Sequence, residues 1–411
     1  MNAGRKMKEF RKKYDVLVAG GGVAGVAAAL SSSRAGMKTV LVEKNIQLGG
    51  LATSGNVFGY LPLCDGQGRQ VIFGIAEELL HASIKYGPGD IPGDWENPES
   101  VSRYSVCFSP AAFVLALDEL VMNAKVDVWL DTVICQPTMN KDRITGLEVE
   151  NKSGRGIIEA KCIIDATGDA DVSFRTGVPC EERDNFPVIW AFQISLEAAR
   201  AAVHENNAGK LLDLVWQGGS DIGEGLPPGL RKYLGTNGKD VSEFVLVSRK
   251  LLRDYFVREQ AMMGKSGRDN LFPVALPSMA DFRTTRRIHG LKTLGSSDFF
   301  KNFDDSVGLV ADWRGPGGSR KNVWEVPFGT LVPQKIHGLL VAGRCISATG
   351  AAWEDMRVIP AAALTGEVAG IAAALAVSNN TTPEDIQVKD IRKEMDRRNI
   401  LYSLDGLHGN V

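Results

Sequence analysis

Apolar and polar residues follow a regular order at the start of the chain. Residues 14–19 (YDVLVA) form a short apolar run with β-branched side chains, which predicts a buried strand. Glycines dominate residues 20–25, and the Ala- and Ser-rich residues 26–34 predict a helix with small side chains. Residues 38–43 (KTVLVE) predict a second strand that ends in an acidic side chain. Strand, glycine turn, helix and strand in this order predict an α/β fold.

Helices and short strands continue to about residue 180. Apolar positions within residues 68–86 predict an amphipathic helix. Ser109 followed by Pro110 is typical of a helix start and predicts a helix over residues 111–123. Residues 87–100 are rich in Pro, Gly and Asp and predict a loop. Three short β-type runs complete this part, at residues 126–133, 144–149 and 157–164.

The residue pattern changes after residue 180, and the pattern of the nucleotide-binding part returns near the C-terminus. Residues 188–196 predict a strand and residues 242–263 one long helix, with loops at 218–229 and 314–320. A strand with a glycine turn is predicted again at 338–344, before an Ala-rich helix at 361–377. These changes predict five parts: a basic tail (1–13), a nucleotide-binding domain (14–180), an inserted α+β substrate domain (181–330), the C-terminal part of the nucleotide-binding domain (331–378), and a C-terminal helix and tail (379–411).

The glycines after the first strand have a spacing with a mechanical meaning. Gly20, Gly22 and Gly25 match G-x-G-x-x-G. Gly20 permits a tight turn, Gly22 lets a pyrophosphate approach the backbone, and Gly25 lets helix and strand pack closely. The helix N-terminus presents free N–H groups to the phosphates, and Glu43 would accept hydrogen bonds from a ribose 2′-hydroxyl. This arrangement predicts dinucleotide binding; the alternative is a glycine-rich turn without a ligand.

Three further segments bear on which dinucleotide is bound. Gly49-Gly50, with Thr53 and Ser54 after them, resemble the stretch that passes the flavin in flavoproteins with two dinucleotide-binding domains; the alternative is a flexible loop. Small residues at 166–168 end a predicted strand and would let it approach a cofactor, or form an ordinary turn. The N-terminus of the helix at 361–377 would face the flavin, or the helix belongs simply to the core.

Taken together, these segments resemble the FAD-dependent oxidoreductase family, in the superfamily of fumarate reductase-like flavoproteins. The resemblance is carried by residues 14–25, 43–55, 163–171, 286–290, 324–333 and 339–370. It implies a Rossmann-like FAD-binding domain, with a mixed sheet and a β-meander, and an inserted α+β substrate domain. The motifs and the resemblance together imply FAD contacts by Gly20, Gly22, Val23, Ala24, Gly25, Glu43, Lys44, Gly49, Gly50, Leu51, Thr53, Val133, Ala166, Thr167, Gly168, Gly343, Arg344, Arg357, Val358 and Ile359.

Composition narrows the classes of partner. The formal net charge of −2 gives no field that would attract nucleic acid, and no uncharged apolar run of membrane-spanning length is found, so we expect neither nucleic-acid binding nor a membrane span. None of the six cysteines forms a C-x-x-C pair, which argues against a metal site and a redox dithiol. Scattered free thiols and the lack of a secretory signal favour a cytoplasmic protein. The 45 glycines among 411 residues exceed the usual share and fit a fold with close backbone approaches.

Candidates for catalysis come from position alone. His289 stands in a basic cluster with Arg283, Arg286 and Arg287, and it is a candidate base; the alternative is a structural histidine. The arginines, Arg287 among them, are candidates to bind a substrate carboxylate, or else form a solvated surface. Glu354, just before the flavin-facing Arg357, is a candidate acid or base.

Three functions are consistent with these features. The first is an FAD-dependent dehydrogenase or oxidase that transfers a hydride between a small polar metabolite and the flavin. A second nucleotide fingerprint is missing, so the flavin would be reoxidised by an external acceptor of unknown identity. The second is an FAD- or NAD-binding enzyme of non-redox or nucleoside-modification chemistry, and the third a flavin-binding scaffold without turnover. A homo-oligomer is left open.

Overall fold

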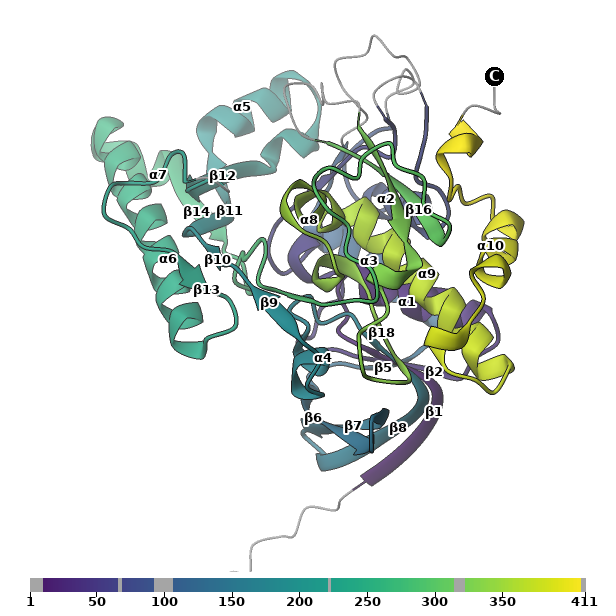
Figure 1. Ribbon diagram of the computed structural model, residues 1–411. Coiled ribbons are helices and arrows are strands. Elements are labelled where there is room, and N and C mark those ends of the chain that lie inside the picture. The colour runs from purple at the N-terminus through teal and green to yellow at the C-terminus, as the bar shows by residue number, and fades with distance from the viewer. Residues whose placement is uncertain (1–9, 66–68, 92–105, 221–222, 314–321, 408–411) are drawn as a thin grey trace, which may run out of the picture.

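The computed structural model describes residues 10–65, 69–91, 106–220, 223–313 and 322–407. Its largest element is a seven-stranded mixed sheet in the order β5-β2-β1-β8-β7-β6, with β18 also paired to β8 (Figure 1). β1, β2, β5, β8 and β18 run parallel, while β6, β7 and β8 form an antiparallel meander. The bounds are β1 Phe10–Ala19, β2 Thr39–Val42, β5 Asp127–Trp129, β6 Val133–Asn140, β7 Arg143–Asn151, β8 Gly154–Asp165 and β18 Leu339–Val341. The predicted Rossmann-like sheet with a meander is therefore confirmed.

The first strand begins earlier than its apolar run. Residues 10–13, expected in the basic tail, are part of β1 and pair in register with Gly156–Glu159 of β8. The Phe10 ring lies where a Cβ on Gly156 would be, and it packs against Trp129 at 5.3 Å between centroids. Arg11 and Lys13 bind Glu159 at 2.8 and 3.0 Å. The tail prediction is thus corrected for these residues, because strand pairing with β8 and the Glu159 carboxylate hold them in the sheet.

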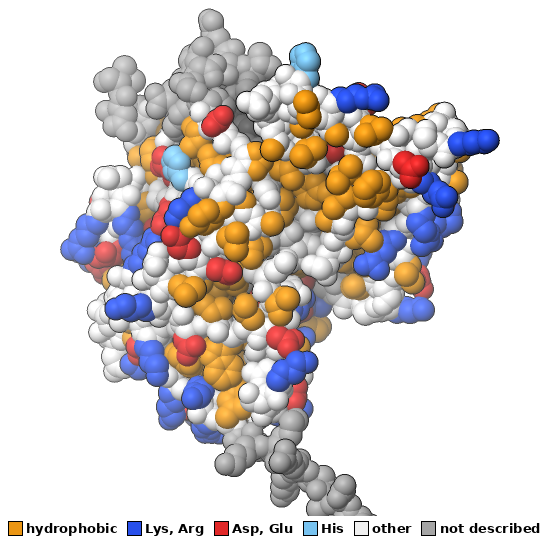
Figure 2. All heavy atoms as spheres, turned by 180° about the vertical axis from the view of Figure 1, so that it is seen from behind, with side chains coloured by type: hydrophobic (Ala, Val, Ile, Leu, Met, Phe, Trp, Pro, Cys, Tyr) orange, Lys and Arg blue, Asp and Glu red, His pale blue; other side chains and the backbone are white. Residues whose placement is uncertain are grey.

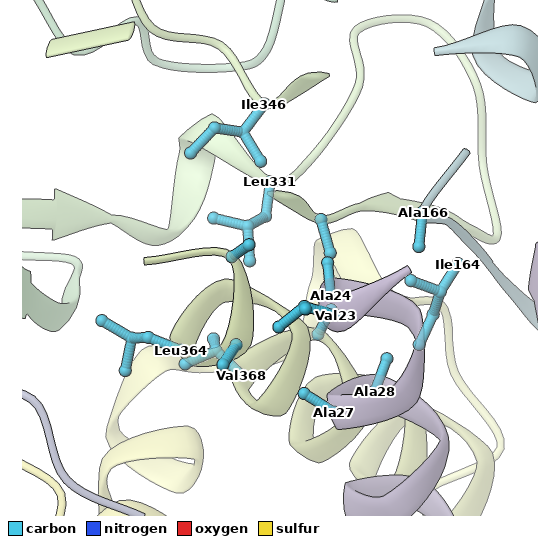
Figure 3. Packing of buried hydrophobic residues seen from close by; sticks show 14 of the residues in the cluster. Val23, Ala24, Ala27, Ala28, Ile164, Ala166, Leu331, Ile346, Leu364 and Val368 are labelled. Atoms are coloured by element: carbon cyan, nitrogen blue, oxygen red, sulfur yellow. The ribbon is translucent and has the colours of Figure 1, made fainter. Parts of the chain in front are cut away.

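Two helices of small residues pack against each other beside this sheet. α1 (Val23–Arg34) contacts α9 (Ile359–Ser378) so closely that a Cβ on Gly366 would lie 2.1 Å from the Ala24 carbonyl oxygen. Figure 3 shows Ala24 and Ala27 of α1 pointing toward the turn of α9 that carries Leu364 and Val368. The small residues of α9 thus serve helix-to-helix packing. α9 is long and apolar enough to cross a membrane, but 83% of its apolar window is buried within the protein, and here it is a core helix.

A second, smaller sheet lies apart from the first (Figure 1). Its three strands have the order β12-β11-β14, and the long helix α6 (Gly238–Met262) covers one face through a cluster that includes Ile189, Val215 and Leu252. The strands are β11 Val188–Ser195, β12 Asp213–Gly218 and β14 Leu271–Ala275, and the short helices α5 Leu196–His204 and α7 Gly267–Asn270 flank them. β11 and α6 correspond to the strand at 188–196 and the long helix at 242–263 that were predicted for the inserted part of the chain.

The C-terminal end of the insertion packs elsewhere. The hairpin of β16 (Ser306–Ala311) and β17 (Val323–Pro327) contributes Leu309 and Trp324 to the main core, and Gly308 lies against Leu364 of α9. The packing of the second sheet therefore ends well before residue 330. The division of the chain into separate domains stays a prediction.

The remaining elements connect these layers. α3 (Pro110–Asn123) begins as predicted, with the Ser109 hydroxyl accepting a hydrogen bond from the Ala112 N–H at 3.4 Å. α2 (Ile75–Ile84) is shorter than predicted, since Gly74 before it has a φ of +70°. The others are β3 Gly59–Tyr60, β4 Val106–Cys107, α4 Asp171–Arg175, β9 Cys180–Glu182, β10 Asp184–Asn185, β13 Tyr233–Leu234, β15 Arg286–Ile288, α8 Gly350–Met356 and α10 Val388–Arg397. The predicted loop at 314–320, most of the one at 87–100 and both chain ends fall outside the described residues.

Candidate flavin and substrate site

One cavity of about 730 Å³ joins the two sheets. Its first wall comes from the ends of β1, β2, β8 and β18 and the loops that follow them, and its second from β11, β12 and residues 279–283. The carboxyl ends of parallel strands and the N-termini of the helices after them therefore open into the same space as the insertion. This is where ligands bind in open α/β sheets.

In two glycine stretches of the first wall, the backbone itself lines the cavity, because glycine has no side chain. Gly22 and Gly49 make a parallel bridge, which brings the predicted turn at 20–25 against the predicted flavin stretch at 49–55. A Cβ on Gly22 would meet nothing nearer than the Gly50 Cα at 4.0 Å, so this backbone faces open space. A Cβ on Gly25, in contrast, would lie 1.8 Å from the Gly20 carbonyl oxygen. Gly22 thus leaves room for a ligand, while Gly25 allows helix and strand to pack.

The N-termini of α1 and α9 both open into the cavity. Val23 and Ala24 line it from the first turn of α1, and Ile359 and Ala362 from the first turn of α9. Neither helix has a side-chain N-cap. First-turn N–H groups have no partner within a helix and carry its positive dipole end, so both termini favour negative charge on a ligand.

The acid at the end of β2 holds the glycine turn. The Glu43 carboxylate accepts hydrogen bonds from the N–H of Gly21 at 2.6 Å and of Asn45 at 2.8 Å, and it also lines the cavity. A carboxylate has about four acceptor positions, so two of them remain for a ribose hydroxyl. Glu43 therefore positions the turn in addition to the ribose role predicted for it.

Arg344 ties three segments together at the far end of this wall. Its guanidinium donates to the carbonyl oxygens of Gly168 at 2.6 Å and Phe282 at 3.0 Å, and it pairs with Asp169 at 2.6 Å. Burial raises the pKa of Asp169, but the charge of Arg344 and the hydrogen bonds from Thr285 and Arg344 bring it below its ordinary value. Arg344 lines the cavity and fixes the turn at 166–168 relative to the insertion.

The second wall is mostly aromatic. It carries Trp190, Trp216 and Phe282, with Met279, and Phe58 and Trp313 reach the same cavity from neighbouring segments. Trp190 and Trp216 are paired across β11 and β12. A wall of this composition binds planar or apolar groups by stacking and burial.

The mostly aromatic wall also carries one carboxyl group, that of Asp281. Asp281 is 5% exposed and lines the cavity, and its Oδ2 accepts a hydrogen bond from the Trp190 N–H at 3.2 Å. Its buried Oδ1 has no hydrogen-bond partner and lies beside Gly55 of the flavin stretch. Burial raises the pKa of Asp281 to about 8, against the smaller opposing effects of the Trp190 N–H and of the Arg283 charge. Near neutral pH this group is therefore able to hold a proton.

The structure brings most of the predicted cofactor residues together. Those that line the cavity are Gly20, Gly22, Val23, Ala24, Glu43, Lys44, Gly49, Gly50, Leu51, Ala166, Thr167, Gly168, Gly343, Arg344, Arg357, Val358 and Ile359. Three others do not line it. Gly25 is a packing glycine, the Thr53 hydroxyl donates to the Leu48 carbonyl oxygen at 2.6 Å, and Val133 is 52% exposed at the start of β6.

The three predicted catalytic residues lie outside the cavity lining. The His289 N–H donates to the Pro179 carbonyl oxygen at 2.8 Å, and Arg287 is buried against Glu181 and over the Trp353 ring. Glu354 pairs with Arg183 at 3.5 Å. Arg286 is likewise buried and pairs with Glu182 at 3.0 Å. Arg283, the third arginine of the predicted cluster, lines the cavity and donates to the Gly219 carbonyl oxygen at 3.0 Å, so carboxylate binding at Arg283 stays a prediction. His289, Arg287 and Glu354, the three predicted catalytic residues, thus contact other protein groups outside the cavity.

Sequence reasoning missed Asp281 and the two tryptophans. All three belong to the insertion, where no spacing motif marks a site. The sequence of β11 did hold a signal, because its side chains alternate between two faces. Trp190 lies on the face opposite the one on which Ile189 and Ala191 pack against α6. The pairing that makes this signal useful is set only by the fold.

The first wall fits FAD. Backbone without side chains at Gly22, two uncapped helix N-termini and an acid at the end of β2 match a pyrophosphate, a flavin edge and a ribose. Among the described residues, no group of three or more His, Cys, Asp or Glu side chains is placed to hold a metal ion.

Comparison with known proteins agrees with this geometry. The chain matches the family described as FAD dependent oxidoreductase over residues 15–186 and 185–395. Digeranylgeranylglycerophospholipid reductase of Picrophilus torridus is 30% identical over 158 residues, which cover 38% of this chain and 39% of the relative. Thioredoxin reductase of Ureaplasma parvum is 32% identical over 71 residues, 17% of this chain and 23% of the relative. The chain thus spans well under half the length of the curated relatives it matches.

Solved structures extend the likeness of fold. The crystal structure of p-nitrophenol 4-monooxygenase PnpA from Pseudomonas putida DLL-E4 superimposes with a TM-score of 0.51 at 12% sequence identity, covering 94% of this chain and 85% of that one. At this identity the match concerns the fold alone. The family match covers nearly the whole chain, and with it FAD is the cofactor and the protein an enzyme of redox chemistry. The chain belongs to the FAD-dependent oxidoreductase family.

Proposed function

We propose that this enzyme exchanges a hydride between FAD and a small-molecule substrate bound against the aromatic wall, and that an external acceptor or donor closes the cycle. The observation that carries the proposal is the single cavity shared by the cofactor wall and by Trp190, Trp216 and Phe282 of the insertion. FAD supplies the two-electron chemistry when bound. The two alternatives without redox turnover have no support in the family match.

The substrate in this proposal differs from the small polar metabolite expected from the sequence. The wall opposite the cofactor residues is built mostly of indole, phenyl and thioether side chains, with Ser220, Asp281 and Arg283 beside them, and apolar surface dominates the lining. A substrate with a planar or apolar body gains from burial there, whereas a polyhydroxylated one would lose hydrogen bonds to water. We therefore place an apolar reacting end, not a sugar or hydroxy acid, against Trp190 and Trp216.

Asp281 is the group proposed to handle the proton. Its carboxyl lies between the flavin stretch at Gly55 and the substrate wall at Trp190. With a pKa near 8, the carboxylate form accepts a proton when the substrate is oxidised, and the acid form donates one when it is reduced. His289, Arg287 and Glu354 have no part in this proposal, because none of them lines the cavity.

A flavin-reduction screen tests the proposal in both directions. The FAD-loaded enzyme is mixed anaerobically with candidate donors that differ in polarity, and the dithionite-reduced enzyme with candidate acceptors. We expect aromatic or apolar alcohols, amines or alkenes to change the visible flavin spectrum, and matched polar compounds to leave it unchanged. Turnover confined to sugars and hydroxy acids would contradict the assigned substrate wall.

A further inference from the structure

The second sheet has a face opposite the one that carries Ile189 and Ala191, since side chains alternate along a strand. At its cavity end Trp190 packs against a cluster that includes Phe244 of α6 and Phe282, while the outer end, at Ile194 and Phe272, is exposed. Residues directly paired across antiparallel strands share a face. The register pairs Trp190 with Trp216, Phe192 with Leu214, and Ile194 with Phe272. These six side chains, all apolar, form what we call the free face.

The free face runs from the cavity to the surface without a polar break. Trp190 and Trp216 line the cavity at one end. Phe192 lies in the middle, edge-on to the cavity residue Phe58 at 5.4 Å between ring centroids. Ile194 and Phe272 form the outer end and are 39% and 40% exposed. Figure 2 shows hydrophobic side chains gathered on the side of the molecule that holds the second sheet.

We propose that the free face binds the apolar chain of the substrate, so that the substrate is an amphiphile or hydrocarbon whose reacting end enters the cavity. This inference rests on the proposed function for the location of the reacting end. At about 3.3 Å per residue, the distance from Trp190 to Ile194 gives a track of about 13 Å. Trp216, Ile194 and Phe272 are 39%, 39% and 40% exposed, whereas Phe192 is 8% exposed beside Phe58. Contiguous exposed apolar side chains mark binding sites.

Continuity with the cavity favours a substrate chain over a protein partner. A standard interface takes about 800 Å² from each partner and roughly 20–30 residues a side, and the free face offers six side chains. A docked protein also has no use for a track that continues into a cofactor cavity. A second copy of this chain is nevertheless an outcome that the experiment must detect.

Calorimetric titration of the FAD-loaded enzyme with straight-chain 1-alkanols, from butanol to dodecanol, tests the inference. Each methylene buried on the track should increase the affinity about fourfold, until the chain is longer than the track and the affinity levels off. An affinity that does not depend on chain length would overturn the proposal. This measurement needs no variant and no turnover, so chain-length-dependent binding would leave the apolar site standing even if the flavin-reduction screen refuted the proposed function.

Surface variants locate the site. Ile194→Lys and Phe272→Lys should each weaken dodecanol binding at least about tenfold, the loss expected on removing one apolar side chain from the contact. Val257→Lys is the matched control, because Val257 is 69% exposed on α6, away from the free face, and this change should leave binding unaltered. Equal effects of all three variants would overturn the proposal. So would a dimer of the wild type, by light scattering, that both free-face variants convert to monomer without alkanol.

Discussion

The carboxyl group of Asp281 accepts a hydrogen bond from the backbone N–H of Trp190, 3.2 Å away, across the boundary between the cofactor wall and the substrate wall. The two residues are 91 positions apart in the chain. The contact puts an ionisable oxygen in a mostly aromatic wall, next to the backbone of Gly55. This carboxyl is the group on which the proposed proton transfer depends.

Asp281→Asn should separate the proton-transfer role from the structural one. Asn keeps the shape and an oxygen for the Trp190 N–H but cannot exchange a proton in the working range. Loss of a general acid or base slows a reaction by about 10²–10⁴-fold, and we expect a slowing of that size in the anaerobic rate of flavin reduction. A variant that reduces the flavin at the wild-type rate would remove Asp281 from the mechanism.

The same variant has a second readout in stability against pH. Burial raises the pKa of Asp281 from 3.8 in the unfolded chain to about 8 in the folded protein, so the folded state binds the proton more tightly. The free energy of unfolding therefore falls as pH rises from about 4 to about 8, because the folded protein must give up that proton. Denaturant titrations across this range should show the Asp281 contribution in the wild type and its absence in Asp281→Asn.

Two glycine substitutions distinguish cofactor contact from packing. A Cβ added at Gly22 meets only open cavity, so Gly22→Ala should keep the stability of the FAD-free protein and weaken FAD binding at least about tenfold, measured by flavin fluorescence. A Cβ at Gly25 would lie 1.8 Å from the Gly20 carbonyl oxygen, so Gly25→Ala should destabilise the protein itself, by about 3 kcal/mol or more. Similar effects of both changes on FAD-free stability would contradict these roles.

Arg344→Met should destabilise the protein in the absence of FAD. It leaves the charge of Asp169, whose side chain is 16% exposed, without its partner. Such a change costs about 3–5 kcal/mol in fully buried pairs, so we expect a loss of about 3 kcal/mol or less here. The control is the double variant Arg344→Met with Asp169→Asn, which removes the unpaired charge. Chemical denaturation should show that the double variant recovers part of the loss; a purely additive result would mean that the pair is not coupled.

His289→Ala serves as a negative test. The imidazole does not line the cavity, and the backbone of His289 is held by Pro179, so flavin reduction should change by less than about twofold. A large slowing, in the range expected for loss of a base, would restore the catalytic role predicted from sequence.

The cofactor half of the site could be predicted from the sequence because its residues lie close together along the chain. Turn, helix and acid follow one another within residues 20–43, and each piece has its own spacing rule. The meeting of Gly22 with Gly49 and the packing of α1 on α9 followed from small residues at matching places. The substrate half could not be predicted in this way. The fold places Asp281 against Trp190, and the pairing of β15 with β9 holds His289 away from the cavity. No short sequence pattern encodes either placement.

The central claim is that flavin and substrate share the cavity between the two sheets, and single-turnover flavin reduction tests it most directly. A donor identified by the screen is mixed anaerobically with the wild type, with Trp216→Ala, and with Val257→Ala as a control on the far side of α6. We expect Trp216→Ala to raise the donor concentration that gives the half-maximal rate of flavin reduction at least about tenfold, since an aromatic contact with the donor is lost. Val257→Ala should behave as the wild type. Unchanged reduction in Trp216→Ala across all donor concentrations would contradict the central claim.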